Sequence, residues 1–451
     1  MAQHNIEKWD PAYALLKPFV RLNFRGYFRS IRIRGKEHIP RDQPVIYAPN
    51  HHNALMDALA VLYALPGQPV FFARSDIFRN PFIARILTFL KLLPIYRIRD
   101  GYNSLQNNEK IMRKAEDVLA QKKSLVIFPE GDHAPERRLR PLKKGICRMA
   151  FQAEERQGFE LGLQIVPVGL DYDNFYKFQH DLGIRFGRPI PVDPYRELYR
   201  QNPSKAHIAL KKEIAGELKQ LMVHIADQHH HDLINNLRKI GHTQKKVHPG
   251  GSFSGGAGRL EEDQKLIKAF EKKCSEEPQR AAFLDRQVRL FVRILDRLNL
   301  RTWVFNRSHY SWLSLLARLP IFAVLLPLFL YGLVSNALPF FLPVLAIRKI
   351  KDPQFWSSFK NGLALVLFPL FYLLQTVVVA VLTDSAWMAA AYLVSLPPTG
   401  YLAFYYYVGL KKWWARVRYN VLLKKHPRLI RKIHHLREDI LHTMDEWTAR
   451  K

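Results

Sequence analysis

Cysteine is scarce in this 451-residue chain, which contains only Cys147 and Cys274. Two cysteines exclude a disulfide framework and a metal centre built from thiolates, and so few of them are typical of a protein in a reducing compartment. The N-terminal residues also lack a small-residue cleavage site and the apolar core, about 7–15 residues long, that mark a secretory signal. We therefore expect no secretory signal.

Acidic residues are also few. The chain has 39 Asp and Glu against 69 Lys and Arg, which gives a net charge of +30 at pH 7. Such an excess requires an acidic partner, and nucleic acid, anionic lipid and a phosphorylated substrate are the candidates. Between Pro11 and Gly35 there is no acid at all, and arginines alternate with aliphatic and aromatic residues. This pattern predicts that residues 1–35 form a basic amphipathic segment on an anionic membrane.

Short apolar runs alternate with helical patterns in the first half of the chain. The predicted strands are 31–34, 45–48, 70–73, 124–128, 165–170 and 184–186, and the predicted helices lie near 54–65, 82–90, 107–121 and 144–155. This alternation predicts an α/β domain over residues 30–240, with a mixed sheet flanked by helices.

The composition changes after that domain. Residues 241–263 contain a run of glycine and serine and are expected to be a flexible linker, and residues 264–311 are expected to form a charged helical region. The three adjacent histidines at 229–231 do not share one helix face, so we expect no metal site there.

Two histidines and an aspartate, His51, His52 and Asp57, stand where the strand 45–48 gives way to the helix 54–65. If Asn53 is the helix N-cap, His52 precedes the cap and Asp57 lies inside the first helical residues, so the two side chains are neighbours. A carboxylate beside an imidazole fixes its tautomer and prepares it to act as a general base. Helix capping on a protein surface would use the same residues without chemistry.

Two further segments contain residues suited to a phosphorylated ligand. The first runs from Phe128 to His133 and is followed by Arg137, Arg138, Arg140, Lys143 and Lys144. A strand that ends in a Pro-Glu-Gly turn with cations behind it is typical of a site for a small phosphorylated molecule. The second runs from Ile95 to Asp100 and contains Arg97 and Arg99. Solvated turns and surface ion pairs would account for both segments equally well.

In order along the chain, four segments resemble the four sequence blocks of the glycerolipid acyltransferases, a family that includes lysophosphatidate and glycerol-phosphate acyltransferases. The segments are His51 or His52 with Asp57, residues 95–100, Phe128–Gly131 and Val166–Gly169. The resemblance implies that the block-one histidine deprotonates an acceptor hydroxyl while Asp57 orients it. The alkoxide then attacks the thioester of acyl-CoA or an acyl-carrier protein, and neither a metal nor a cofactor takes part.

The resemblance also implies which residues bind the acceptor, glycerol 3-phosphate or lysophosphatidate. Glu130 and Gly131 resemble the acceptor-binding turn, and Arg97 or Arg99 resembles the phosphate-binding arginine of the second block. At His133 in the third block, Arg137, Arg138 or Lys143 is the candidate substitute for a phosphate contact. Two positions depart from the family pattern. The spacing to Asp57 fits His51 by resemblance and His52 by helix geometry, so both are retained. His133 stands where the family has an arginine, which keeps a non-phosphate acceptor such as a lyso-aminolipid open as an alternative.

The last third of the chain contains long uncharged runs. Residues 312–410 are predicted to be a membrane region with runs at 319–347, 361–383 and 385–410, each long enough to cross a bilayer. Basic residues flank both ends of the first run, and only Asp384 separates the other two. The positive-inside rule then predicts a re-entrant hairpin at 319–347, a transmembrane pair at 361–383 and 385–410, and a cytoplasmic tail at 411–451. Three simple spans are the alternative.

These features together predict a multi-pass membrane acyltransferase of phospholipid biosynthesis whose catalytic domain lies on the cytoplasmic face. A non-catalytic polybasic protein that binds anionic membrane lipids would also use the charge and the apolar runs. It would not need histidine, aspartate and glutamate in the observed order. Nucleic-acid binding would use the charge but leaves the apolar runs unexplained, so no nucleic-acid partner is expected.

Overall fold

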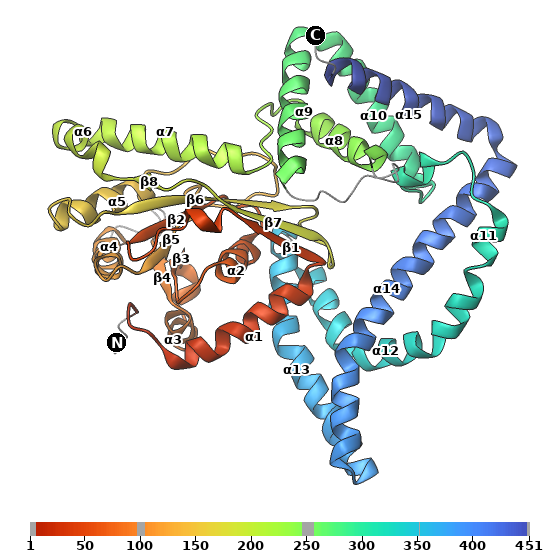
Figure 1. The fold of residues 1–451 in the computed structure, drawn as a ribbon, viewed down its shortest axis with the longest axis horizontal. Helices are drawn as coiled ribbons and strands as arrows, with labels where there is room; N and C mark the ends of the chain where they lie inside the picture. Colours follow the sequence, from red (N-terminus) through yellow and green to blue (C-terminus); the bar gives the residue numbers. More distant parts are fainter. Residues whose placement is uncertain (1–5, 97–103, 246–256, 351, 449–451) are drawn as a thin grey trace. The chain divides into compact units, whose positions relative to one another are not determined.

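The computed structural model describes residues 6–96, 104–245, 257–350 and 352–448 (Figure 1). The chain divides into two compact units, which we describe separately. The first, here the α/β unit, comprises residues 1–224 with 350–361, and the second, here the helical unit, comprises residues 225–349 with 362–451. The α/β domain was predicted to end near residue 240, whereas the α/β unit ends at His224 and also takes in a short segment from much later in the sequence.

The α/β unit is built on a mixed sheet of eight strands in the described residues, with the order β1-β7-β6-β2-β5-β3-β4 and β8 paired to β6. Strands β7 and β8 run antiparallel to β6, and the other pairs are parallel. The strands are β1 Ser30–Arg34, β2 Val45–Pro49, β3 Val70–Arg74, β4 Leu92–Ile95, β5 Ser124–Val126, β6 Gln164–Tyr172, β7 Asp181–Phe186 and β8 Ile190–Pro191. The predicted mixed sheet is confirmed.

Helices cover both faces of this sheet (Figure 1). They are α1 Pro11–Tyr27, α2 Ala54–Ala64, α3 Pro81–Phe89, α4 Ser104–Ala120, α5 Gly145–Arg156, α6 Arg196–Gln201 and α7 Pro203–Leu221. Successive side chains of strand β2 point to opposite faces of the sheet, so this strand contributes to the hydrophobic core on each face. Ile46 and Ala48 pack in one cluster with α4, α5 and α7, while Val45 and Tyr47 pack in the other with α1 and α2. A central strand buried on both faces is continuously apolar.

The parallel strands β2, β5 and β6 are neighbours in the middle of the sheet. Tyr47 pairs with Val126, and Pro49 pairs with Val168. Because the carboxyl ends of parallel strands meet at one edge, the segments that follow these three strands come together there. The β2–α2 turn, the turn after β5 and the end of β6 are therefore brought to one place.

The helical unit contains the remaining helices, except that the first residues of α13, up to Asn361, belong to the α/β unit. These helices are α8 His231–Lys245, α9 Ala257–Glu276, α10 Pro278–Arg297, α11 Trp312–Leu316, α12 Leu319–Ala346, α13 Trp356–Thr383, α14 Ala386–Lys425 and α15 Pro427–Thr448. Helices α12 and α14 pack closely, since a Cβ added to Gly332 would lie 2.2 Å from the carbonyl oxygen of Thr399. The side chain of Asn336 on α12 accepts a hydrogen bond from the Tyr372 hydroxyl of α13 at 2.6 Å. A partly buried polar contact thus joins α12 and α13.

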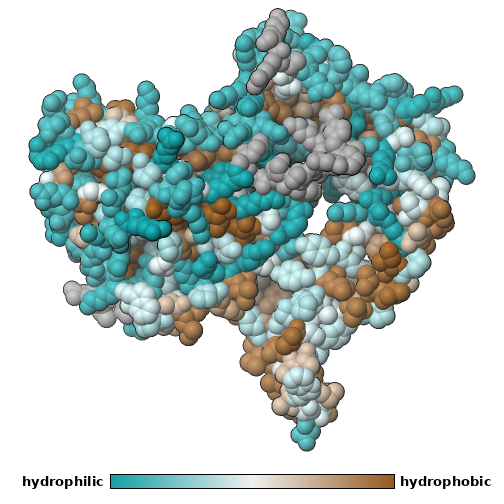
Figure 2. All heavy atoms as spheres, in the orientation of Figure 1, coloured by the Kyte–Doolittle hydropathy of each residue, from teal (hydrophilic) through white to brown (hydrophobic). Residues whose placement is uncertain are grey.

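By length and composition, two helical stretches in the described residues are candidates to cross a membrane, Trp312–Lys349 and Trp356–Thr383. Apolar residues gather on the visible surface of these helices (Figure 2). Residues 319–346 form one curved helix, α12, in place of the predicted hairpin (Figure 1). Its interior prolines each remove one backbone donor and bend the helix without ending it. Residues 386–410 lie within the longer helix α14, of which Ser385 is the N-cap, and α14 is not among the helices apolar enough to cross a membrane.

Candidate active site

The turn between β2 and α2 is unusual in its backbone. Helix α2 begins at Ala54, a non-glycine residue with φ of 43°. Asn53 occupies the N-cap position, as predicted, but its side chain makes no capping hydrogen bond. Instead the carboxylate of Asp57, inside the helix, accepts the backbone N–H groups of His52 and Asn53, each at 2.7 Å. Asp57 therefore satisfies backbone donors at the start of α2 that have no partner within the helix.

The same carboxylate is fully buried and holds two side chains. Oδ2 lies 2.8 Å from Nδ1 of His51, and Oδ1 accepts a hydrogen bond from the Tyr172 hydroxyl at 2.7 Å. Burial alone would raise the pKa of Asp57, but the hydrogen bonds and charges of His51 and its neighbours, including the Asn53 backbone N–H, together outweigh it, and the pKa lies below its usual value. Burial and the Asp57 charge raise the pKa of Tyr172 well above its ordinary value. Near neutral pH the aspartate is thus ionised and the tyrosine is a donor.

The imidazole of His51 is therefore oriented by a carboxylate. Its ring stacks on Phe128 with centroids 4.1 Å apart, and its side chain is 16% exposed. With Nδ1 donating to Asp57, the lone pair of the neutral ring is on Nε2, which has no hydrogen-bond partner within the described residues. A ring held on one nitrogen and open on the other is the arrangement that a general base requires.

The second histidine, His52, is placed differently. Its ring is buried, with Nδ1 3.1 Å from the Asn50 side-chain nitrogen and Nε2 3.5 Å from the carbonyl oxygen of Arg138. Burial lowers its pKa and keeps the ring neutral near pH 7. Helix geometry predicted that this ring would contact Asp57, but only its backbone N–H does. That prediction assumed a regular first turn, whereas the positive φ of Ala54 redirects the chain.

Glu130 supports the same turn from the segment after β5. Its buried carboxylate accepts the backbone N–H of His51 at 2.7 Å through Oε1, and through Oε2 the backbone N–H and Nε of Arg140 at 3.0 and 3.2 Å. Gly131 follows with φ of 70°, which favours glycine, and turns the chain. Both carboxylate oxygens of Glu130 are thus used inside the protein, on the backbone of the histidine and on one arginine.

The predicted cations lie in different surroundings. Arg137 is buried, donates to the Asp171 carboxylate at 2.7 Å and stacks on Phe175, so it holds the end of β6 in place. The side chain of Lys143 packs along Gly131, and this lysine is exposed. Arg97 and Arg99 lie outside the described residues. Arg140 has a buried terminal nitrogen, Nη2, without a hydrogen-bond partner in the described part of the chain. The sequence indicated it only as one member of a basic run.

His133 lies beside His51, with ring centroids 5.2 Å apart. Its Nε2 is buried and has no partner within the residues that the structure describes. Burial and the neighbouring His51 lower its pKa, so the ring is neutral near pH 7. The residue that replaces an arginine in the family pattern thus offers a neutral hydrogen-bonding group, not a positive charge.

The comparisons with known proteins agree with this geometry. Residues 30–171 match the family model described as "Acyltransferase". The chain is 24% identical over 301 residues to glycerol-3-phosphate O-acyltransferase 2 of Saccharomyces cerevisiae, covering 61% of this chain and 39% of that protein. It is 30% identical over 147 residues to 1-acyl-sn-glycerol-3-phosphate acyltransferase of Borreliella burgdorferi, covering 32% of this chain and 53% of that protein. Residues 30–171 form a domain of the glycerolipid acyltransferase family.

The chain therefore spans between 39% and 53% of the length of these two relatives. Among solved structures it is similar to the 1-acyl-sn-glycerophosphate acyltransferase PlsC from Thermotoga maritima. That match has a TM-score of 0.32 and 18% sequence identity, and it covers 45% of this chain and 78% of that one. The matched residues 30–171 include the site residues of the β2–α2 turn and of the segment after β5. They leave the helical unit outside the glycerolipid acyltransferase domain.

Several residues of the candidate active site were missed by sequence reasoning. Tyr172 holds the second oxygen of Asp57, Phe128 stacks on His51, and Asn50 joins the turn to the end of β6 by accepting the N–H of Leu170 at 2.6 Å. A signal for Tyr172 was present in the sequence. It ends the strand that carries the fourth block, and neighbouring parallel strands deliver their carboxyl ends to one edge.

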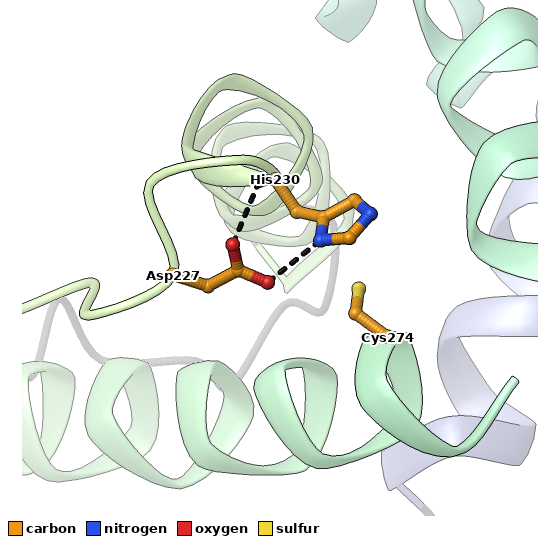
Figure 3. A group of neighbouring side chains, drawn as sticks. All are labelled: Asp227, His230 and Cys274. Atoms are coloured by element: carbon orange, nitrogen blue, oxygen red, sulfur yellow. Dashed lines mark hydrogen bonds and ion pairs between the residues drawn. The ribbon is translucent and has the colours of Figure 1, made fainter. Parts of the chain in front are cut away.

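A second group of titratable side chains lies in the helical unit, where Asp227, His230 and Cys274 bring metal-type ligand atoms within 4.8 Å of one another (Figure 3). Asp227 accepts the backbone N–H of His230 at 3.0 Å and lies 2.6 Å from its ring Nδ1. Burial raises the pKa of the Cys274 thiol to about 12. These hydrogen bonds join Asp227 to His230 just before α8.

Proposed function

We propose that this chain transfers a fatty acyl group from an acyl thioester to a hydroxyl of glycerol 3-phosphate or lysophosphatidate. The observation that carries the proposal is the His51 ring, bonded to a buried carboxylate at Nδ1 and open at Nε2. The glycerolipid acyltransferase domain at residues 30–171 supports it, and the relatives of this chain are named for these two acceptors.

In the proposed reaction, Nε2 of His51 takes the proton of the acceptor hydroxyl while Asp57 stabilises the imidazolium that forms. The acceptor oxygen attacks the thioester carbonyl carbon, the carbon–sulfur bond breaks, and the imidazolium returns its proton to the leaving thiolate. The acceptor itself is the nucleophile, so no residue of the chain needs to become acylated. Tyr172 and the backbone N–H groups of His52 and Asn53 hold the carboxylate in place.

The phosphate of the acceptor needs cations near His51. Arg140 supports this part of the proposal, because Glu130 links it directly to the His51 backbone and one of its terminal nitrogens has no partner in the described residues. A guanidinium can hold a phosphate by two parallel hydrogen bonds, which an ammonium cannot. Lys143, exposed beside Gly131, is a second candidate for contact with the phosphate.

One observation favours a second acceptor class. His133, beside the proposed base, is neutral near pH 7 and has a buried Nε2 without a partner among the described residues. A neutral ring in this position would hydrogen-bond the hydroxyl or amide of a lyso-aminolipid without the charge that a phosphate requires. This acceptor is the alternative to a phosphate ester.

We further propose that the protein works at a membrane. Helix α1 has two opposite apolar faces: Phe24 and Tyr27 pack into the α/β unit, whereas Leu15, Phe19 and Leu22 are exposed. The exposed residues are spaced as one stripe along the helix. Phe82, Ile83 and Ile86 of α3 are exposed as well. These residues fit an interfacial surface, and the two apolar stretches of α12 and α13 fit membrane spans.

The test is an acyl-transfer assay on purified membranes that contain the full chain. Labelled glycerol 3-phosphate, lysophosphatidate and a lyso-aminolipid are offered separately, each with acyl-CoA and with an acyl-carrier-protein donor. Transfer to a phosphate ester is expected. Transfer to the lyso-aminolipid alone would replace the first acceptor class by the second, and no transfer to any acceptor would refute the proposed activity.

A further inference from the structure

The start of α13 lies inside the α/β unit. Residues 350–361 belong to that unit although they begin about 160 residues beyond its last strand, β8, in the sequence, and they include the first residues of a helix apolar enough to cross a membrane. Ser357 is fully buried there, and Ser358 is 5% exposed. The segment is thus packed into the fold that holds the candidate active site.

Ser357 reaches the turn that holds the proposed base. Its hydroxyl donates a hydrogen bond to Oδ1 of Asn53 at 2.7 Å, and both residues are buried. The side-chain nitrogen of Asn53 donates to the carbonyl oxygen of Phe175 at 3.0 Å, and its backbone N–H donates to Asp57 at 2.7 Å. A line of hydrogen bonds therefore runs from Ser357 through Asn53 to the carboxylate that orients His51.

Three other contacts place the same segment at the site. The ring of Phe355 packs edge-on to His133 with centroids 4.9 Å apart, and His133 is the neighbour of His51. Trp356 packs against the ring of Tyr176, and the ammonium of Lys360 donates to the Tyr176 carbonyl oxygen at 2.6 Å. The segment thus touches the β2–α2 turn, the segment after β5 and the loop after β6.

We infer that Ser357 is a positioning residue of the acyltransferase site and acts on the His51–Asp57 pair through Asn53. The inference rests on the proposed function. A buried amide oxygen that loses its donor pays the full cost of desolvation, and it recovers part of that cost by turning toward another donor. When Asn53 turns, its backbone N–H leaves the geometry in which it holds Asp57. Small displacements of this kind lower the rate of a positioned reaction far more than they weaken substrate binding.

The test compares Ser357→Ala with Ser358→Ala in the full chain in membranes. The two serines are adjacent and buried, but Ser358 Oγ has no hydrogen-bond partner within the described residues, so the second variant controls for lost packing. Ser357→Ala is expected to lower kcat about tenfold, with both KM values changed less than about twofold. Ser358→Ala should match the wild type, and Ser357→Thr, which retains the hydroxyl, should restore most of the rate.

A double-mutant cycle with Asn53→Ala separates positioning from general damage. If Ser357 acts through Asn53, adding Ser357→Ala to Asn53→Ala should change kcat less than about twofold. The inference would be overturned if the losses of kcat in Ser357→Ala and Asn53→Ala multiplied in the double variant. An unchanged kcat in Ser357→Ala, or an equal loss of kcat in Ser358→Ala, would also overturn it. In each of these cases, the proposed function still holds if the wild-type chain transfers acyl groups. A wild-type chain without transfer overturns both.

Discussion

Replacing His51 by alanine tests the proposed mechanism most directly. The change removes the ring that is open at Nε2 and leaves the rest of the turn in place, because Asp57 keeps the backbone N–H groups of His52 and Asn53 and the hydroxyl of Tyr172. Loss of a general base lowers a rate by about 10²–10⁴-fold, which corresponds to about 3–5 kcal/mol of activation free energy. We expect this loss in kcat, with the two KM values nearly unchanged.

His52→Ala is the matched variant, since it removes the same side chain one residue later. This ring is buried and contacts Asn50 and the carbonyl of Arg138. Its removal is expected to lower the free energy of unfolding by about 1–3 kcal/mol. It should change kcat far less than His51→Ala does. The two variants thus separate a loss of catalysis from a loss of stability.

The assay measures initial rates of acyl transfer in membranes with saturating donor and acceptor, together with the thermal unfolding of each variant. The rates are corrected for the amount of folded protein. The reasoning is refuted if His52→Ala lowers the corrected kcat more than His51→Ala. Small and equal effects of both changes would also refute it, because then neither ring takes the proton.

Three further predictions concern the neighbours of the site and the topology. Tyr172→Phe leaves one oxygen of the buried Asp57 without a donor, so kcat should fall about tenfold in the transfer assay, and an unchanged kcat would show that this bond does not matter. His52 is buried and its pKa is lowered from 6.5. As the pH falls, this ring therefore takes up a proton in the unfolded chain before it does so in the folded protein. Unfolding experiments should therefore show stability falling as the pH drops below 6.5, by up to about 1.4 kcal/mol per pH unit from this group, and the slope should decrease in His52→Gln. In a variant without the native cysteines, an impermeant thiol reagent on intact cells should label Asp384→Cys but not Arg348→Cys, and labelling of the second would contradict the predicted orientation.

The sequence predicted which side chains gather at the turn but not their geometry. Strand, turn and helix were predicted at the right places, and Asp57 was expected beside an imidazole. Which of the two imidazoles lies against Asp57 depended on the path of the backbone, where Ala54 has a positive φ. A non-glycine residue in that conformation leaves no pattern in the sequence, because hydrogen bonds from elsewhere in the fold hold it there.

The contact between Ser357 and Asn53 was beyond sequence reasoning for a different reason. The two residues are 304 positions apart, and each has an ordinary local explanation, one as a helix start and the other as a cap. The membrane prediction shows the same limit. Two of the three predicted runs coincide with helices long and apolar enough to cross a membrane, but the charge pattern suggested a hairpin where the structure has one helix with internal prolines. Periodicity describes single elements, and it says little about which distant elements meet.

Asp57 both holds the start of α2 and orients His51, and this has a consequence for how the protein loses activity. The carboxylate that ties down the first backbone groups of α2 is the one that orients His51, so the order of this turn and the readiness of the proposed base are a single property. Helix ends open locally at much lower free energy than the whole fold. Fraying of the first turn of α2 would leave the sheet and both cores intact and still release the imidazole. Inactivation by heat or mild denaturant should then precede global unfolding, as a local event at one helix end.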